Sequence, residues 1–214
     1  MRKLKGASVH PDPSVRLQAV MAAGLVPSEQ DLETLIAWCR VEPDFQVREM
    51  LTWTLLRLPR ESVVPRLVDE LKRPEAQARA QALHTLSKSG AVETWDVVAA
   101  QLDDEDSVVV RTSWYAAVAL VPDNRREWLG RRLAERLGQG DGPTQLSLSR
   151  ALVALGMDVA ESALASVGHD TREAVLKHVA EVRRLINDPE GAFAPSLLTA
   201  RREVAMGRTR STKG

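Results

Sequence analysis

Apolar residues recur every three or four positions through most of this chain, and short polar turns interrupt them. Within residues 61–71, one helical face collects the apolar side chains Val63, Val64, Leu67, Val68 and Leu71. Proline cannot continue a helix, so Pro74 separates this stripe from a second one over residues 78–89, and Gly90 is well placed to stop the second helix. The pattern therefore predicts two helices joined by a tight turn.

The same plan fits the neighbouring segments, with a proline, glycine or acidic turn between the helices of each pair. The predicted helices are residues 2–9 and 13–24, 31–40 and 47–58, 93–102 and 107–120, 124–137 and 144–155, and a last pair within 158–186 with its turn at 168–170. No strand pattern appears, so the sequence predicts an all-α fold.

A repeated phrase runs through these predicted pairs. Arg16, Arg48, Arg79 and Arg111 stand in similar surroundings, and they are 32, 31 and 32 residues apart. A fixed period of this size is typical of stacked units that share a core. We therefore predict an α-solenoid, or superhelix, of about six antiparallel helical hairpins over residues 1–190, with clear repeats at 10–121 and degenerate ones at 124–186. Residues 191–214 are predicted to form a short helix and a basic, flexible tail.

The composition excludes several classes of protein. The 214 residues carry a net charge of +0, which argues against a strongly basic nucleic-acid binder. The single cysteine, Cys39, allows no intrachain disulfide and fits a reducing compartment. Because the chain shows no leader and no apolar run of membrane-spanning length, we expect a cytoplasmic protein without a membrane partner.

The repeated phrase resembles a HEAT repeat, and is most similar to the short bacterial kind known as the PBS-lyase HEAT-like repeat. The residues that carry this resemblance are Asp12-Pro13 with Val15-Arg16-Ala19, Asp44 with Val47-Arg48-Leu51, Pro74 with Ala78-Arg79-Ala82, and Asp106 with Val110-Arg111. It covers residues 10–121 well and 124–186 weakly. The resemblance implies an α-solenoid whose second helices line the concave side.

Two interpretations of the repeat arginines are open. They form either a structural ladder against acidic residues such as Asp12, Asp44 and Asp106, or a set of contacts to an anionic ligand. The planar guanidinium group suits the ladder because it offers several directed donors. Recurrence in each unit, whatever the shape of a ligand, favours the structural role for Arg16, Arg48, Arg79 and Arg111.

The second helices also supply a candidate binding surface. Positions two, five and nine after the repeat arginines should face the concave side, and they include aromatic, thioether and basic side chains. Such residues are common anchors at interfaces. The predicted partner-binding residues are Met21, Met50, Trp53, Arg57, Gln81, His84 and Lys88. The opposing interpretation is that Trp53 packs between units and the others are ordinary surface.

Enzymatic alternatives find less support. Some HEAT-like solenoids are DNA glycosylases for alkylated bases, and Trp95-Asp96 could be assigned to that role, but the predicted concave face has no excess of Lys and Arg for phosphate contacts. The related bilin lyases handle a pigment attached through a cysteine, whereas Cys39 fits a small buried residue. The acidic run at residues 103–106 fits helix capping, and the scattered histidines have no metal-ligand spacing.

The sequence thus favours a non-catalytic scaffold or adaptor that binds a protein or peptide, without a cofactor or metal. The alternative is a nucleic-acid-acting protein such as an alkylated-base glycosylase. The sequence leaves the identity of the partner open, and a monomer is expected.

Overall fold

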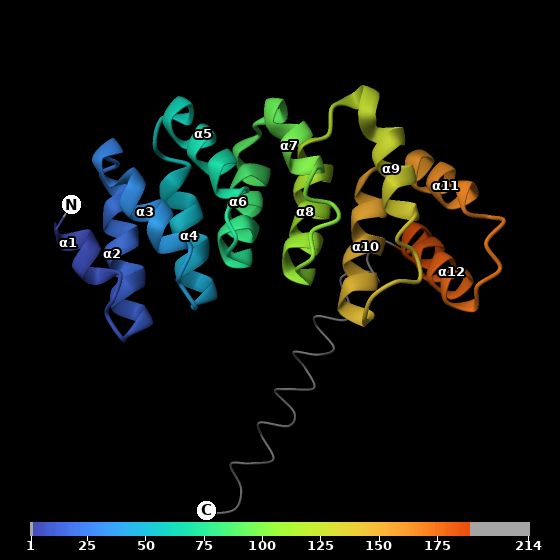
Figure 1. The fold of residues 1–214 in the computed structure, drawn as a ribbon, viewed down its shortest axis with the longest axis horizontal. Helices are drawn as coiled ribbons and strands as arrows, with labels where there is room; N and C mark the ends of the chain where they lie inside the picture. The colour runs from blue at the N-terminus through green and yellow to red at the C-terminus, as the bar shows by residue number, and fades with distance from the viewer. Residues whose placement is uncertain (1, 189–214) are drawn as a thin grey trace, which may run out of the picture. The chain divides into compact units, whose positions relative to one another are not determined.

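Pairs of short helices make up residues 2–188, the part of the chain that the computed structural model describes, and no strand occurs in that range (Figure 1). The prediction of an all-α, HEAT-like solenoid is confirmed. The chain divides into two compact units, Met1–Leu129 and Gly130–Gly214. The predicted limits of the solenoid stay a prediction, and the predicted tail at 191–214 lies outside the described residues.

In unit 1 the second helices of successive pairs contact one another in order, α2 with α4, α4 with α6 and α6 with α8, and the first helices pack against them. Short 3-10 turns lead into α3, α7 and α9. The helices of this unit are α1 (Arg2–Ala7), α2 (Pro13–Leu25), α3 (Leu32–Cys39), α4 (Phe45–Leu55), α5 (Arg60–Glu70), α6 (Ala76–Ser89), α7 (Trp95–Ala99), α8 (Ser107–Leu120) and the start of α9 (Arg126–Ala134).

Aspartate residues start three of these second helices. The carboxylates of Asp12, Asp44 and Asp106 accept hydrogen bonds from backbone amides in the first turns of α2, α4 and α8, which satisfies donors that a helix leaves without partners. Helix α6 differs, because the side chain of Glu75 caps no amide there. It ends at Gly90 with φ of 64°, as the sequence predicts.

The core of unit 1 lies between the two rows of helices. Leucines such as Leu51 and Leu83 are fully buried on the second helices. Three of the five tryptophans belong to this core, since Trp38, Trp95 and Trp114 are each exposed by 5% or less. Most tryptophans of the chain therefore serve packing, and Trp53 and Trp128, which are 39% and 40% exposed, are the exceptions.

One first helix is shorter than the sequence predicts. Residues 93–102 were expected to form a single helix, but the structure has a 3-10 turn at Val92–Thr94, then α7 at Trp95–Ala99. The amide of Leu102 bonds the carbonyl of Ala99, three residues back, so the end of the segment is also tightly wound.

Unit 2 contains the rest of α9, α10 (Gly142–Ala154), α11 (Met157–Ser166) and α12 (Glu173–Asn187), and α10, α11 and α12 pack on one another. His178 of α12 is buried in this unit. Its Nδ1 accepts a hydrogen bond from the amide of Gly138 at 3.1 Å, and its Nε2 lies 3.0 Å from the Gln145 carbonyl. Burial lowers the pKa of His178, and these contacts fit the neutral ring.

None of the helices within residues 2–188 combines the length and the apolar character that crossing a membrane requires.

Candidate functional site

Arg16 of α2 binds a carboxylate that belongs to the next repeat. Its Nε and Nη2 donate to the two oxygens of Glu42, at 2.9 and 2.7 Å, and Glu42 is 1% exposed. Its Nη1 donates to the carbonyl oxygens of His10 and Pro11, in the turn before its own helix. Arg16 therefore ties its own turn to the turn that follows α3.

Arg79 of α6 repeats this arrangement. Its Nε and Nη2 donate to the two oxygens of Asp104, at 2.7 and 2.8 Å, and its Nη1 donates to the carbonyl oxygens of Arg73 and Pro74. The hydrogen bond from Arg79 holds the pKa of the Asp104 carboxyl below its usual range. Such two-point arginine–carboxylate pairs are among the stronger polar contacts in proteins.

The two carboxylates share a second contact as well. Glu42 accepts from the backbone amide of Asp44, and Asp104 accepts from that of Asp106, each at 2.9 Å. Each acid therefore stands two residues before the N-cap of a second helix, and joins that N-cap to the arginine of the preceding repeat. Glu42 also accepts from the indole N–H of Trp38 at 2.7 Å.

The acidic partners predicted for the ladder were therefore wrong. Asp12, Asp44 and Asp106 use their carboxylates to cap the helices on which the arginines lie. A short side chain at an N-cap is within reach of its own first-turn amides, and this local bond competes with a longer-range pair. The acids two residues earlier were missed, and their spacing of 25 or 26 residues from the preceding arginine is the signal that could have found them.

Arg48 of α4 keeps only half of the arrangement. Its Nη1 donates to the carbonyl oxygens of Glu42 and Pro43, at 3.1 and 2.7 Å, and its guanidinium lies 5.9 Å from the centre of the Phe45 ring. Within residues 4–188, no carboxylate pairs with its Nε or Nη2. The residue 25 positions on, where Asp104 follows Arg79, is Arg73.

Arg111 does not share the register of the other three arginines. Arg16, Arg48 and Arg79 are each the fourth residue after the N-cap of their helix, whereas Arg111 is the fifth after Asp106. The residue in the equivalent position of α8 is Val110. The prediction that Arg111 is a fourth equivalent member of the ladder is therefore corrected.

Trp53 is partly packed and partly open. Its ring lies on Gly24 of α2, so closely that a Cβ at Gly24 would lie 2.0 Å from Trp53 Cζ3. Even so, 39% of Trp53 is exposed, and the guanidinium of Arg57 lies 5.1 Å from its ring centre. Met21, which is 43% exposed, lies on the same α2 helix. The packing interpretation of Trp53 thus holds in part, since the ring packs on α2 and presents one side to solvent, and partner binding by Trp53 stays a prediction.

The other predicted partner-binding residues differ in exposure. His84 Nε2 and Lys88 Nζ lie 2.7 and 2.8 Å from the two oxygens of Glu49, a residue that the sequence analysis missed. Burial lowers the pKa of His84 despite the attraction of Glu49. Met50 is half-buried. Gln81 is only 7% exposed, because its amide donates to the Arg48 carbonyl and the Thr52 hydroxyl of α4, and its role in partner binding stays a prediction.

A groove of about 470 Å³ lies in unit 1 across the N-terminal halves of three second helices, α4, α6 and α8. Its apolar lining includes Phe45 and Val108, which are 64% and 49% exposed. Arg48 and the Glu49–His84 pair line it as well. We call this feature the second-helix groove.

Two further hollows in the protein are smaller than the second-helix groove. One of about 300 Å³ in unit 1 is lined by Trp95, Asp96, Arg125 and Trp128, with the two indole rings edge to face at 5.7 Å. Trp95 is buried, so Trp128 supplies most of the open aromatic surface.

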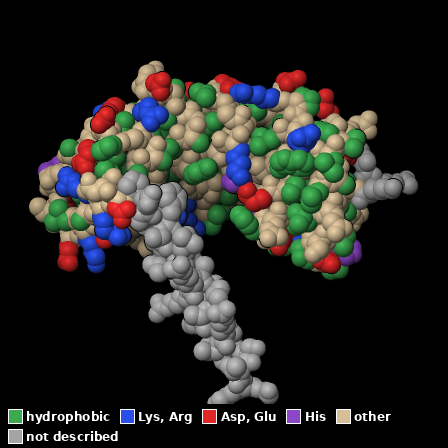
Figure 2. All heavy atoms as spheres, turned by 180° about the vertical axis from the view of Figure 1, so that it is seen from behind, with side chains coloured by type: hydrophobic (Ala, Val, Ile, Leu, Met, Phe, Trp, Pro, Cys, Tyr) green, Lys and Arg blue, Asp and Glu red, His purple; other side chains and the backbone are tan. Residues whose placement is uncertain are grey.

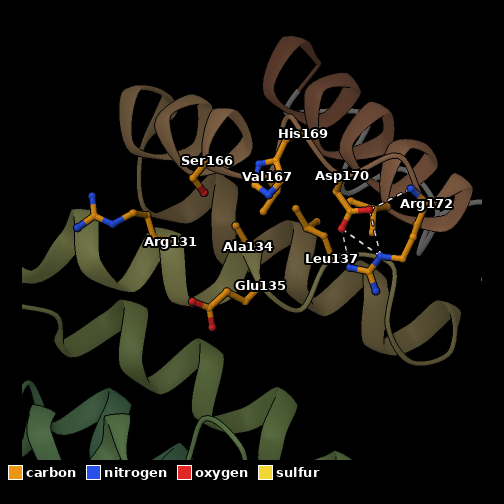
Figure 3. Close-up of a pocket in the computed structure, with 10 residues that line it drawn as sticks. Arg131, Ala134, Glu135, Leu137, Ser166, Val167, His169, Asp170 and Arg172 are labelled. Carbon is orange, nitrogen blue, oxygen red and sulfur yellow. Dashed lines mark hydrogen bonds and ion pairs between the residues drawn. The ribbon is translucent and has the colours of Figure 1, made fainter.

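The other hollow, of about 410 Å³, lies in unit 2 between the end of α9 and the turn before α12, and Figure 3 shows its lining. Asp170 and Arg172 point toward each other there and form an ion pair at 2.6 Å. The charges of these two side chains are thus used between themselves.

Cys39 is buried on α3, and burial together with the charge of Glu70 raises the pKa of its thiol to about 12. A thiol of this kind is not ionised at neutral pH, so it lacks the reactive thiolate of a nucleophile. Residues 4–188 also contain no group of three His, Cys, Asp or Glu side chains arranged to hold a metal ion.

The helical pairs of unit 1 stack in order along the chain, and this arrangement is that of an α-helical repeat protein. The family model for HEAT repeats matches residues 32–119. The match to HEAT repeats is thus limited to this part of the chain, which includes Arg48 and Arg79.

Solved structures similar to this chain include engineered and designed proteins. An engineered protein from a structural genomics consortium is 15% identical, with a TM-score of 0.47 over 86% of this chain and 97% of that one. A designed armadillo repeat protein is 13% identical, with a TM-score of 0.43 over 86% of this chain and 98% of that one. A comparison with curated proteins gives no match.

Proposed function

We propose that this protein is a non-catalytic scaffold that binds a protein or peptide partner on the second helices of unit 1. The observation that carries the proposal is the exposed side of Trp53, whose ring packs on Gly24 and has the guanidinium of Arg57 5.1 Å from its centre. A rigid aromatic ring beside a cation is a frequent anchor at protein interfaces. The second-helix groove adds the exposed ring of Phe45 on the same α4 helix.

The fold supports a binding role in a second way. Solenoid repeats present a broad surface that exists before the partner arrives, so little ordering cost falls on their side of the complex. On the face that Figure 2 shows, acidic and basic side chains are interspersed and do not gather in a patch of one sign. Such a surface suits a protein partner better than the phosphate backbone of a nucleic acid.

The proposal is tested by selecting peptides that bind the protein from a displayed random library and measuring their affinity by fluorescence anisotropy. We expect Trp53→Ala to weaken binding by at least tenfold, in line with the loss of an aromatic anchor. Trp128→Ala is the matched control, because Trp128 is 40% exposed and lies on α9, which is not one of the second helices of unit 1. Arg57→Gln tests the same surface with less disturbance of packing.

Peptides that bind Trp53→Ala and the wild-type protein equally well would exclude this surface. The nucleic-acid alternative predicts instead a salt-dependent gel shift with DNA. Retardation at low salt that vanishes as salt rises would favour that alternative, and its absence at low salt would exclude it.

A further inference from the structure

The contacts between successive repeats of unit 1 can be compared with one another. We call a joint the contact between the repeat arginine of one second helix and the turn that precedes the next second helix. At two joints one carboxylate is bound twice: by the Nε and Nη2 of the arginine in the preceding repeat, and by the amide of the N-cap residue two positions on. Glu42 fills this position beside Arg16 and Asp44, and Asp104 fills it beside Arg79 and Asp106. The same construction recurs in two separate places with distances of 2.7–2.9 Å.

The joint between α4 and α6 has the donors of this construction without its acceptor. Arg48 is the arginine in register, and its Nη1 is fixed on two turn carbonyls just as in the other repeats. Glu75 is the N-cap residue of α6. Arg73 occupies the position two residues earlier, where the other joints have an acid, and its Nε lies 3.6 Å from Glu70. A cation thus replaces the expected anion.

Three acids on the elements around this joint are engaged elsewhere. Glu49 is held by His84 and Lys88, and Asp106 caps α8. Glu70 binds Arg40 through two hydrogen bonds at 2.6 and 2.7 Å. Arg48 therefore lines the second-helix groove, and its Nε and Nη2 have no carboxylate partner among the residues that the structure describes.

We propose that the joint between α4 and α6 is a binding position for a carboxylate side chain, Asp or Glu, of a peptide that lies in the second-helix groove. This deepens the proposed function and depends on it. The carboxylate takes the place that Glu42 and Asp104 take at the other joints, with Arg48 and the Glu75 amide as donors. Apolar side chains beside it contact Phe45 and Val108, so the partner segment is acidic and apolar in alternation.

The first experiment fills the position from within the chain. Arg73→Asp places a carboxylate 25 residues after Arg48, the spacing of Asp104 after Arg79. We expect this variant to melt at a higher temperature than Arg73→Gln, and we expect the difference to vanish when Arg48→Gln is added to both. The backbone carbonyl of residue 73 still accepts from Arg79 in both variants. Equal melting of Arg73→Asp and Arg73→Gln would overturn the proposal.

The second experiment supplies the carboxylate from outside. The probe is a short labelled peptide that alternates Glu with Leu, compared with a peptide that has Gln in place of Glu. With the wild-type protein we expect the Glu peptide to bind roughly tenfold more tightly, as a charge-assisted pair at a partly exposed site allows. We expect this preference to be lost in Arg48→Gln and also in Arg73→Asp, which leaves Arg48 in place.

The outcomes separate the two proposals. A Glu preference that persists in both variants, or its absence in the wild-type protein, would overturn the carboxylate position. In that case loss of peptide binding in Trp53→Ala would leave the proposed function standing. Loss of the Glu preference in the variants, with Trp53→Ala unaffected, would keep the carboxylate position and remove Trp53 from the binding surface.

Discussion

Arg79→Ala tests whether the arginine ladder stabilises the stack of repeats. The substitution removes four hydrogen bonds of 2.7–2.8 Å, two to Asp104 and two to turn carbonyls. The side chains of Arg79 and Asp104 are only 9% and 8% exposed, so the carboxylate that is left behind has little access to water. Removing one partner of a buried ion pair typically costs about 3–5 kcal/mol, since the other charge stays uncompensated.

We take the lower end of that range, about 3 kcal/mol, because this pair lies in a turn near the surface. The assay is urea unfolding followed by circular dichroism, in which the midpoint falls by roughly 1.5 M for a slope of about 2 kcal/mol per M. Arg60→Ala is the control. Arg60 pairs with Glu93 at 2.6 Å, but these side chains are 52% and 60% exposed, and we expect a much smaller loss.

The pH dependence gives an independent check of the same pair. The pKa of Asp104 is lowered in the folded protein by its bond to Arg79, so Asp104 adds stability above the pKa of the unfolded chain, about 3.9. This stability is lost as the pH falls through the lower, folded pKa. In Arg79→Ala the loss on acidification should be smaller. Equal destabilisation by Arg79→Ala and Arg60→Ala, with unchanged acid sensitivity, would refute the argument.

Two further predictions concern close packing and protonation. Gly24→Ala should destabilise unit 1 and raise the exposure of Trp53, because the new methyl group would lie 2.0 Å from its ring; tryptophan fluorescence and thermal melting measure this. The folded pKa of His178 is lowered by burial, so unit 2 should lose stability as the pH falls below about 6.5, where only the unfolded chain takes up the proton. Hydrogen exchange in α12 follows this loss, and His178→Gln should remove the pH dependence.

Most of the fold could be predicted from the sequence because its signals are local. Apolar spacing, prolines and the glycine at position 90 determine where helices begin and end, and the period of the arginines predicts that the pairs stack. The main local errors concern acidic residues that could fill either of two roles, an ion pair with an arginine or a helix cap. Asp44 and Asp106 were assigned to the ladder because acids near an arginine suggest an ion pair, whereas a first-turn amide is closer to an N-cap side chain.

The candidate site was harder to predict because it depends on contacts between repeats. Trp53 was identified correctly as a position on the second helix, but its seat on Gly24 of another helix is not encoded in either local sequence. Gln81 was assigned to the surface by its spacing, although its amide has partners on the neighbouring α4 helix that draw it inward. Spacing gives the direction of a side chain, whereas its exposure depends on what the next repeat places beside it.

The contacts between repeats also explain why Arg48 differs from the repeat arginines Arg16 and Arg79, although all three stand at equivalent positions. An arginine whose carboxylate lies in the next repeat is a structural link, because both charges are satisfied within the chain. Where the next repeat has Arg73 in place of the acid, the guanidinium of Arg48 keeps its position on the turn carbonyls but gains no internal counter-charge. Arg48 makes the same Nη1 contacts to turn carbonyls as Arg16 and Arg79, which bind carboxylates through their other nitrogens. The proposed carboxylate position therefore needs only a single departure from the repeat pattern, and the turn contacts of Arg48 keep its ordering cost on binding small.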